Sequence, residues 1–457
     1  MQKPDPVNGR PSILPGGALA LCTRRQFLAL SALSAAGWLS GCAVNPVSGS
    51  RQLLLLSEGD EIRLDREHGP HQFSADYGKS QDAALNRYLN DTGRALAART
   101  HRPEMPYSFQ AVNATYVNAY AFPGGTVAVT RGILLALDNE AELAALLGHE
   151  LGHVNARHAA SRMTKGMIGQ LLVTGAGLYA RQGLGPQYAE LTEQLGMLGA
   201  GVLLASYSRE DEREADRLGM EYMVRGGYNP QGMVQLMAML QEQAKKRPSA
   251  LELMFATHPM SDERYRTAVE MASGQYRNAA ALPLQRERYQ DNTATLRAMK
   301  PAIEAIQAGD EALAKKDYPT AEAKLREALR LAPSDYTALV LMAKCQLAQN
   351  RPKEAARYAE LARQAYPEEA QSSHLKGIAA LQLKDYGAAL AAFQTAERRL
   401  PGNPNTLFYL GAAHEGMGQR QPAAEYYRRF LAVGQEGDRP RHAYQRLVEW
   451  GYLRPGR

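Results

Sequence analysis

The chain has 457 residues, of which 45% are hydrophobic and 22% charged, and its formal net charge is +6. Half of this charge lies in the first 41 residues; without them the net charge falls to about +3, which gives no support for nucleic-acid binding. The three cysteines, Cys22, Cys42 and Cys345, do not predict an internal disulfide framework, and we expect Cys345 to be a buried core residue.

Residues 1–41 have the pattern of an export signal: a twin arginine at Arg24-Arg25, an apolar run, and then Leu39-Ser40-Gly41-Cys42. The run of roughly twelve apolar residues is too short to span a bilayer, which needs about 20. The last four residues resemble a bacterial lipoprotein box, which implies that Cys42 is lipidated and begins the mature chain. Ala43 then implies sorting to the outer membrane. The long leader favours twin-arginine export, with the general secretory route left open.

The segment from Thr115 to Thr130 alternates like a strand around a Pro-Gly-Gly turn, with Val117, Val127 and Val129 on it. Two interpretations stay open. The segment is either an edge strand that pairs with an extended peptide backbone or an ordinary core hairpin.

The run from Asp138 to Ala160 predicts a helix. Asn139 followed by Glu142 matches a capping box, and leucines and a valine recur at helical spacing as a buried stripe: Leu143, Leu146, Leu147, Leu151 and Val154. His149 and His153 are four residues apart, so both imidazoles lie on one face and can bind one metal ion. Glu150 projects from the neighbouring flank, where a carboxylate can hold a water molecule. This is the H-E-x-x-H arrangement of zinc peptidases.

A catalytic zinc ion needs a third protein ligand, and three candidates exist. His158 does not fit, because the metzincin spacing requires a glycine and a histidine where Ala156 and Ala159 stand. Glu212 lies on a charged helix together with Asp216, four residues away; Glu212 can bind the metal while Asp216 holds the distal nitrogen of a ligand histidine. His258 is the third candidate.

Four motifs in order resemble the gluzincin peptidases related to the CAAX prenyl protease and the HtpX-type proteases. They are Val117 to Gly125, His149 to His158, Ser208 to Asp216, and Thr257-His258-Pro259 with Arg264 after it. The resemblance covers about residues 112 to 265. It implies that His149, His153 and Glu212 bind one zinc ion per chain and that Glu150 is the catalytic base.

His258 has three possible roles. In the first, His-Pro only ends a segment, with Ser261 capping the next helix. Alternatively the imidazole lies beside the zinc, where it either donates to the oxyanion or occupies the open position and holds the enzyme inactive. The residues that bind substrate are unknown from the sequence.

The stretch from Gly166 to Ala205 is rich in glycine and apolar residues but has no run long enough to span a bilayer. We expect buried or half-exposed helices beside the cleft, with a flexible lid as the alternative.

From residue 301 a step of 34 residues recurs in three columns: Ala321, Ala355, Ala389 and Ala423; Gly309, Ala343, Gly377 and Gly411; Pro333, Pro367 and Pro401. Small residues let paired helices approach closely, and the proline closes each unit. The pattern resembles tetratricopeptide repeats, four of them over residues 301–435, with residues 436–457 as a cap. Their concave groove would bind a peptide or protein partner, or the array rigidifies the first domain.

Together these patterns predict a mainly α protein. We expect a signal peptide over residues 1–41, a zincin-like metallopeptidase domain with a small β-sheet over residues 42–295, and an α-solenoid. The pairing resembles periplasmic quality-control peptidases, which implies a lipid-anchored zinc endopeptidase acting on misfolded or misassembled outer-membrane proteins and working beside their assembly machinery. Two alternatives are a latent protease that acts chiefly as a chaperone or scaffold, and a narrow processing enzyme for one precursor.

Overall fold

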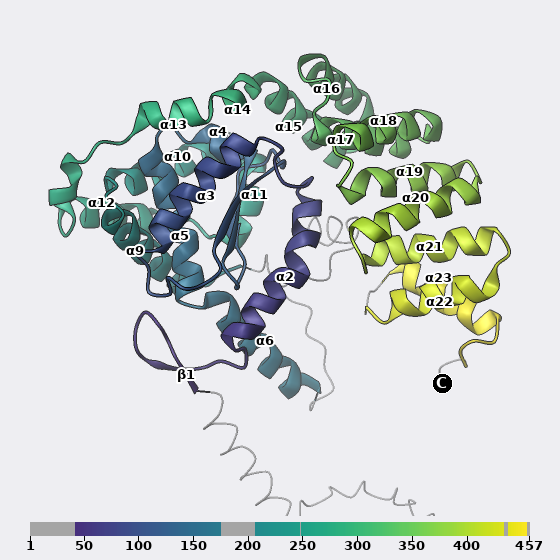
Figure 1. The fold of residues 1–457 in the computed structure, drawn as a ribbon, viewed down its shortest axis with the longest axis horizontal. Coiled ribbons are helices and arrows are strands. Elements are labelled where there is room, and N and C mark those ends of the chain that lie inside the picture. Colours follow the sequence, from purple (N-terminus) through teal and green to yellow (C-terminus); the bar gives the residue numbers. More distant parts are fainter. Residues whose placement is uncertain (1–41, 175–205, 247, 434–436, 455–457) are drawn as a thin grey trace, which may run out of the picture.

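The computed structural model describes residues 42–174, 206–246, 248–433 and 437–454. The predicted export signal and most of the glycine-rich stretch, residues 175–205, lie outside these ranges. Figure 1 shows a mixed first part, with helices around a small sheet, beside a stack of helix pairs. The expected mainly helical fold with a small sheet and a following helical array is confirmed. Within the described ranges, none of the helices combines the length and apolar character that crossing a bilayer requires.

The first part begins with a short hairpin and then alternates helices with a three-stranded sheet (Figure 1). Its elements are β1 (Cys42–Val44), β2 (Arg51–Leu53), α2 (Glu58–Ala75), α3 (Ala83–Ala97), β3 (Ser108–Val112), β4 (Ala119–Ala121), β5 (Thr126–Thr130), α4 (Arg131–Ala136), α5 (Glu140–Asn155), α6 (His158–Thr174), α9 (Arg209–Arg225), α10 (Gln231–Lys246), α11 (Pro248–Thr257), α12 (Asp262–Ser273), the 3-10 helix η1 (Arg277–Ala281), α13 (Arg286–Asn292) and α14 (Ala294–Ala298).

The sheet has the order β3-β5-β4, with β5 parallel to β3 and antiparallel to β4. Residues 119–130 therefore form a hairpin, as the alternation predicted. Because β5 is central, β4 lies at one edge of this sheet. Both interpretations of the segment describe part of it, since β4 is an edge strand and its three residues are also buried.

Helix α5 is shorter and more deeply buried than its sequence predicts. Asn139 caps it by accepting from the backbone N–H of Glu142, as expected. The Glu142 carboxylate accepts from the backbone N–H of Asp138 at 2.7 Å and from the side-chain amide of Asn139 at 2.9 Å, and not from the backbone N–H of Asn139. All residues of α5 are buried, so it packs on every side and not along one stripe.

The single helix expected to run to Ala160 is wrong, because α5 ends at Asn155 and α6 begins at His158. Between them Arg157 takes a left-handed conformation with φ 58°. Its guanidinium Nε donates to the buried Glu61 at 3.0 Å and its Nη2 to the carbonyl of Leu56 at 2.8 Å. These contacts with a segment about a hundred positions earlier hold a bend that local helix propensity disfavours.

The second part is an array of antiparallel helix pairs with one further helix packed on the last pair (Figure 1). Its helices are α15 (Lys300–Ala314), α16 (Tyr318–Leu331), α17 (Tyr336–Ala348), α18 (Pro352–Ala365), α19 (Ala370–Gln382), α20 (Tyr386–Arg399), α21 (Pro404–Gly416), α22 (Arg420–Leu431) and α23 (Asp438–Glu449).

The small residues that recur every 34 positions let paired helices approach closely, as their spacing predicted. A Cβ atom built on Gly377 would lie 2.6 Å from the Phe393 ring of the partner helix, and one on Gly411 would lie 2.5 Å from Tyr427. Pro367 follows the end of α18 by two residues and so closes its unit. Cys345 is a buried free thiol, as expected.

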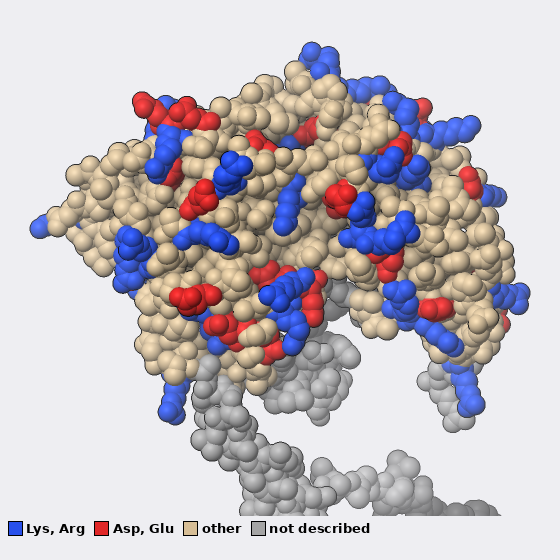
Figure 2. All heavy atoms as spheres, viewed as in Figure 1, with Lys and Arg blue, Asp and Glu red and all other residues tan. Residues whose placement is uncertain are grey.

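A buried ion pair joins the two parts of the molecule. Arg131 at the start of α4 donates to Asp335 at 2.6 Å, to the hydroxyl of Thr337 at 3.1 Å, and to the carbonyl of Asn113. Gln371 of α19 donates to the carbonyl of Ser74 in α2. Figure 2 shows basic and acidic side chains interspersed over the face that it draws, so no patch of one sign covers that face of either part.

Candidate metal centre

Two helices in close contact build the centre. Helix α5 carries His149, Glu150 and His153, and α9 carries Glu212 and Asp216. The helices approach so closely that a Cβ atom on Gly148 would lie 2.8 Å from the carbonyl oxygen of Gly219 in α9. Gly152 lies equally close to Ala215. The small residues beside the histidines and beside the carboxylates therefore let the two motifs face each other.

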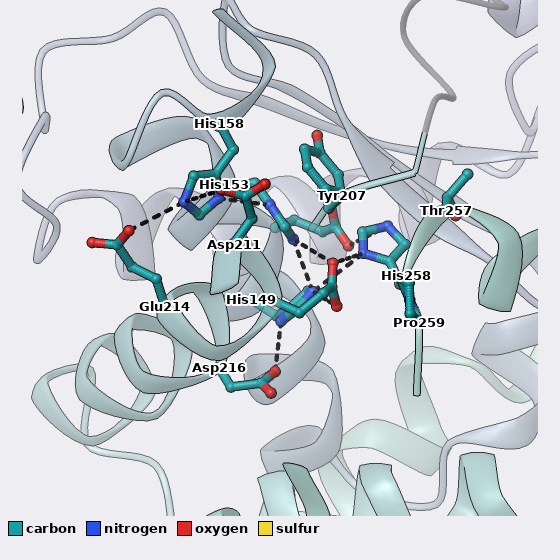
Figure 3. A network of polar contacts seen from close by, with 12 residues as sticks. His149, His153, His158, Tyr207, Asp211, Glu214, Asp216, Thr257, His258 and Pro259 are labelled. Carbon is teal, nitrogen blue, oxygen red and sulfur yellow. Dashed lines mark hydrogen bonds and ion pairs between the residues drawn. The ribbon is translucent and has the colours of Figure 1, made fainter. Parts of the chain in front are cut away.

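Four buried donor atoms converge between these helices and the end of α11 (Figure 3). His149 Nε2 lies 3.1 Å from His153 Nε2 and 3.4 Å from His258 Nδ1. Glu212 Oε1 lies 3.3 Å from His153 Nε2 and 3.0 Å from His258 Nδ1. In a tetrahedral site with metal–nitrogen bonds of about 2.0–2.1 Å, ligand atoms lie about 3.3 Å apart. The spacing and the chemistry of these donors thus fit a single tetrahedral zinc-sized ion.

The nitrogens of the histidine rings that face away from this cluster are also bonded. His149 Nδ1 lies 2.9 Å from Asp216 Oδ1, and His153 Nδ1 lies 2.9 Å from His158 Nδ1, whose Nε2 reaches Glu214 at 3.3 Å. Such outer partners fix the ring orientation and leave the Nε2 lone pairs directed at the cluster.

Two further groups enclose the centre, and the sequence reasoning assigned neither a role. Arg264 of α12 bonds Asp216 with Nε and Nη2 at 2.6 and 2.7 Å and pairs with Glu212 through Nη1 at 2.6 Å. The Tyr207 ring stacks on His153 with centroids 3.8 Å apart. The sequence did contain a signal for the role of Arg264. Two carboxylates buried on one helix face need a cation as a partner, and Arg264 is the basic residue that follows the His-Pro motif.

Charge and burial act in opposite directions on the carboxylates. Burial opposes ionisation of Glu212, but His258, His153 and His149 hold the pKa of its carboxyl well below its usual range. Burial likewise opposes ionisation of Asp216, yet Arg264 keeps its pKa low. At Glu150 burial dominates and raises the pKa of the carboxyl.

Glu150 lies beside the cluster and is not a member of it. Its Oε1 is 3.9 Å from His258 Nε2, while Oε2 is buried without a hydrogen-bond partner among the described residues. A buried carboxylate oxygen without a partner is costly unless a water molecule or ligand binds it. This orphaned oxygen fits a group that takes a proton from a bound water.

His258 is held at the cluster by backbone contacts at the end of α11. Its N–H donates to Met254 O, and the carbonyl of Thr257 accepts from the N–H of Tyr207 at 3.0 Å. Ser261 caps α12, as one of the three interpretations of the His-Pro segment expected. The structure thus brings together His149, His153, Glu212 and His258, with Asp216 behind His149, whereas the side chain of Cys42 lies outside the description.

Comparison with known proteins agrees with both parts. Residues 83–272 match the model of peptidase family M48, and residues 312–377 and 374–439 match tetratricopeptide repeat models. The chain is 30% identical over 232 residues to a beta-barrel assembly-enhancing protease of Yersinia pestis, covering 48% of this chain and 46% of the relative.

Two relatives from Escherichia coli K12 are also similar. One is a beta-barrel assembly-enhancing protease, 29% identical over 50% of this chain and 47% of its own length. The other is metalloprotease YcaL, 26% identical over 52% of this chain and 93% of its own length. The chain therefore spans about half the length of the assembly-enhancing relatives it matches. Within it, residues 83–272 belong to peptidase family M48, and tetratricopeptide repeats follow them.

Proposed function

We propose that the chain is a zinc-dependent endopeptidase of the bacterial periplasm, anchored by a lipid on Cys42, that hydrolyses misfolded or misassembled outer-membrane proteins. The observation that carries the peptidase activity is the cluster of three imidazole nitrogens and one carboxylate oxygen beside the unpartnered Oε2 of Glu150. The relatives named beta-barrel assembly-enhancing proteases support the substrate class. The lipobox pattern at Leu39 to Cys42 supports the anchor, on the outer membrane because Ala43 follows it.

In this proposal His149, His153 and Glu212 hold the metal. A zinc ion bound there would act as a Lewis acid that polarises the scissile carbonyl and lowers the pKa of the attacking water. Glu150 accepts the proton of that water at Oε2 and passes it to the leaving amine. Asp216 accepts from His149 Nδ1–H, which fixes the ring so that Nε2 faces the metal.

The edge strand β4 supports a path for substrate. It lies at the rim of the sheet and packs beside α5, so an extended backbone paired with β4 would pass the metal centre. Pairing through the main chain depends little on the side chains of the substrate. The resulting weak sequence specificity suits a peptidase that cleaves many unfolded sequences.

His258 supports a latent ground state for this enzyme. Its Nδ1 stands at the corner of the donor tetrahedron that an attacking water needs, 3.0 Å from Glu212 and 3.4 Å from His149. The same observation favours the second candidate function, a protease that stays latent while the repeats act as a chaperone or scaffold for outer-membrane assembly.

The test measures bound zinc and casein cleavage together on purified residues 43–457. We expect one zinc per chain. Glu150→Gln should keep the zinc and lower cleavage about 10²- to 10⁴-fold, because the proton acceptor is lost while the ligands remain. Glu212→Ala should lose the zinc. Absence of zinc from the wild-type protein would overturn the proposal and leave a repeat scaffold.

His258→Ala separates the roles of that residue, with His414→Ala in the repeats as the control. Cleavage that rises supports latency, cleavage that falls supports an oxyanion donor, and no change leaves a structural role. In cells, Glu150→Gln distinguishes the candidate functions, because a scaffold would keep its function without the base. Cleavage at one site in a panel of envelope proteins would instead indicate a processing enzyme.

A further inference from the structure

A cavity of about 590 Å³ lies between the two parts of the molecule, away from the metal centre. One wall is the end of α2, with His71, Ser74 and Tyr77. The opposite wall comes from the first helix of each pair, α15, α17, α19 and α21, and from Arg439 at the start of α23. Figure 1 shows α2 standing between the sheet and these helices.

The two walls are fixed to each other. Gln371 donates to the carbonyl of Ser74, and Gln81 donates to the carbonyl of Ala365 at 3.1 Å. Gly78, at φ 79°, lies so close to Tyr366 that a Cβ atom there would be 2.6 Å from its ring. The cavity is therefore pre-formed, and a ligand need not order its walls.

Cationic side chains outnumber carboxylates among the described residues that line this cavity. Arg439 donates to Asn405 and to the hydroxyl of Tyr409 at 3.2 Å, and no carboxylate of the described residues lies within ion-pair distance of it. These contacts leave further guanidinium N–H groups for a ligand, since arginine has five. Lys344 stands 4.9 Å over the Tyr77 ring. Asp310 is the carboxylate among the lining residues.

His374, which also lines the cavity, is an uncharged group beside the cations. Its Nδ1 lies 3.1 Å from the hydroxyl of Thr406. Burial, together with the charges of Arg439 and Lys344, lowers the pKa of His374 to about 3, so the ring is neutral and offers no competing charge. Burial also lowers the pKa of Lys344, which Asp310 opposes. A second anion would compensate these desolvated cations.

Apolar side chains also line the cavity, with Leu313, Leu341, Leu347, Leu375 and Ile378 among them. The last residue of a polypeptide supplies both matching features, because its α-carboxylate and its own side chain lie on one Cα. An internal aspartate or glutamate offers the charge at the tip of a polar side chain and brings two backbone directions into the cavity. The lining thus favours a chain end over a chain passing through.

We propose that this cavity binds the free C-terminal carboxylate of a polypeptide whose final side chains are apolar, with Arg439 as the carboxylate partner and Lys344 adding attraction. Guanidinium and carboxylate match as a bidentate pair. The site lies apart from the metal centre and would hold the end of a client or partner chain whether or not the chain is a peptidase.

Binding of labelled short peptides to the mature chain tests this site by fluorescence anisotropy. The peptides end in two leucines as the free acid, as the C-terminal amide, or as the amide with an internal glutamate. Glu150→Gln protein limits cleavage, and mass spectrometry verifies that each peptide stays intact. We expect the free acid to bind on the order of tenfold more tightly than either amide.

Arg439→Gln should abolish this preference, whereas Arg441→Gln, an exposed arginine on the same helix paired with Asp438, should keep it. Lys344→Gln should reduce it, and circular dichroism melts verify that each variant is folded. Equal binding of acid and amide would overturn the proposal, as would equal binding by the internal glutamate or an unchanged preference in Arg439→Gln. The binding measurement does not depend on zinc content or casein cleavage. Failure of the peptidase proposal would therefore leave this proposal standing, and failure of this proposal would leave the peptidase proposal standing.

Discussion

The metal centre and the cavity beside the repeats are both buried polar sites, but they are built in opposite ways. At the centre, the closest donor atoms, from two touching helices and the end of α11, lie 3.0 to 3.4 Å apart, and the outer nitrogens of His149 and His153 are bonded. In the cavity, groups from α2 and from helices of the second part surround a larger space, and no carboxylate of the described residues pairs with Arg439. The first arrangement is pre-organised for one small ion, while the second leaves binding groups available for an exchangeable ligand.

Arg264→Met would break the metal centre most severely. The variant leaves Glu212 and Asp216 buried without their cation, and breaking such a buried pair costs about 5 kcal/mol in the free energy of unfolding. Urea unfolding with and without a chelator measures this cost, and bound zinc should fall in parallel.

Arg266→Met is the matched control for Arg264→Met, because Arg266 is exposed on the same helix and should change stability by less than about 0.5 kcal/mol. If Arg264→Met unfolded at the wild-type urea concentration with its zinc retained, the carboxylates would not depend on this cation.

Arg131→Met would break the contact between the two parts of the molecule. Asp335 would lose its buried partner, at a cost of about 3 kcal/mol, and the unfolding of the first part should separate from that of the repeats. Two urea transitions in place of one would record the separation.

The double variant Arg131→Met with Asp335→Asn tests the cause. Asparagine still caps α17 in place of Asp335 and carries no charge, so the double variant should recover part of the loss. Equal losses in the single and double variants would mean that packing, and not the ion pair, joins the parts.

The metal centre and the repeats could be predicted from the sequence, because local spacing fixes their key residues, whereas the cavity could not. His149 and His153 share a helix turn, and Glu212 and Asp216 share another, so each pair is fixed by local geometry. The 34-residue columns fixed the helix pairs of the repeats for the same reason. The contact of α5 with α9 followed from the family resemblance, while its physical basis, Gly148 against Gly219, needs the structure.

Features that join distant segments could not be predicted. The bend at Arg157 depends on Glu61, which no local pattern links to it. The cavity depends on α2 packing against the repeats. Its cations come from different places, Lys344 from α17 and Arg439 from α23 after the last helix pair, without a common motif. Long-range docking decides both, and a single sequence carries no spacing signal for it.

Asp216→Asn should weaken metal binding and leave the fold intact. The amide holds His149 less firmly than the carboxylate, and loss of such an outer partner lowers metal affinity about 10- to 100-fold. Competition with a coloured chelator measures the affinity, with Glu221→Gln on the same helix as the control. An unchanged affinity would show that packing alone orients His149.

Gly377→Ala should have the smallest effect, and it tests close packing in the repeats. The added methyl would lie 2.6 Å from the Phe393 ring, an overpacking that costs about 2 kcal/mol, while alanine gains about 1 kcal/mol in helix propensity. The net loss in unfolding free energy is thus about 1 kcal/mol.

Gly387→Ala in the neighbouring α20 is the control. A Cβ atom there would lie 3.9 Å from its nearest neighbour, Asp385, so this variant should stabilise the protein by about 0.5 kcal/mol. Opposite signs for the two variants in thermal melts would show that the glycine column permits the close approach of paired helices; equal signs would show that Phe393 moves aside.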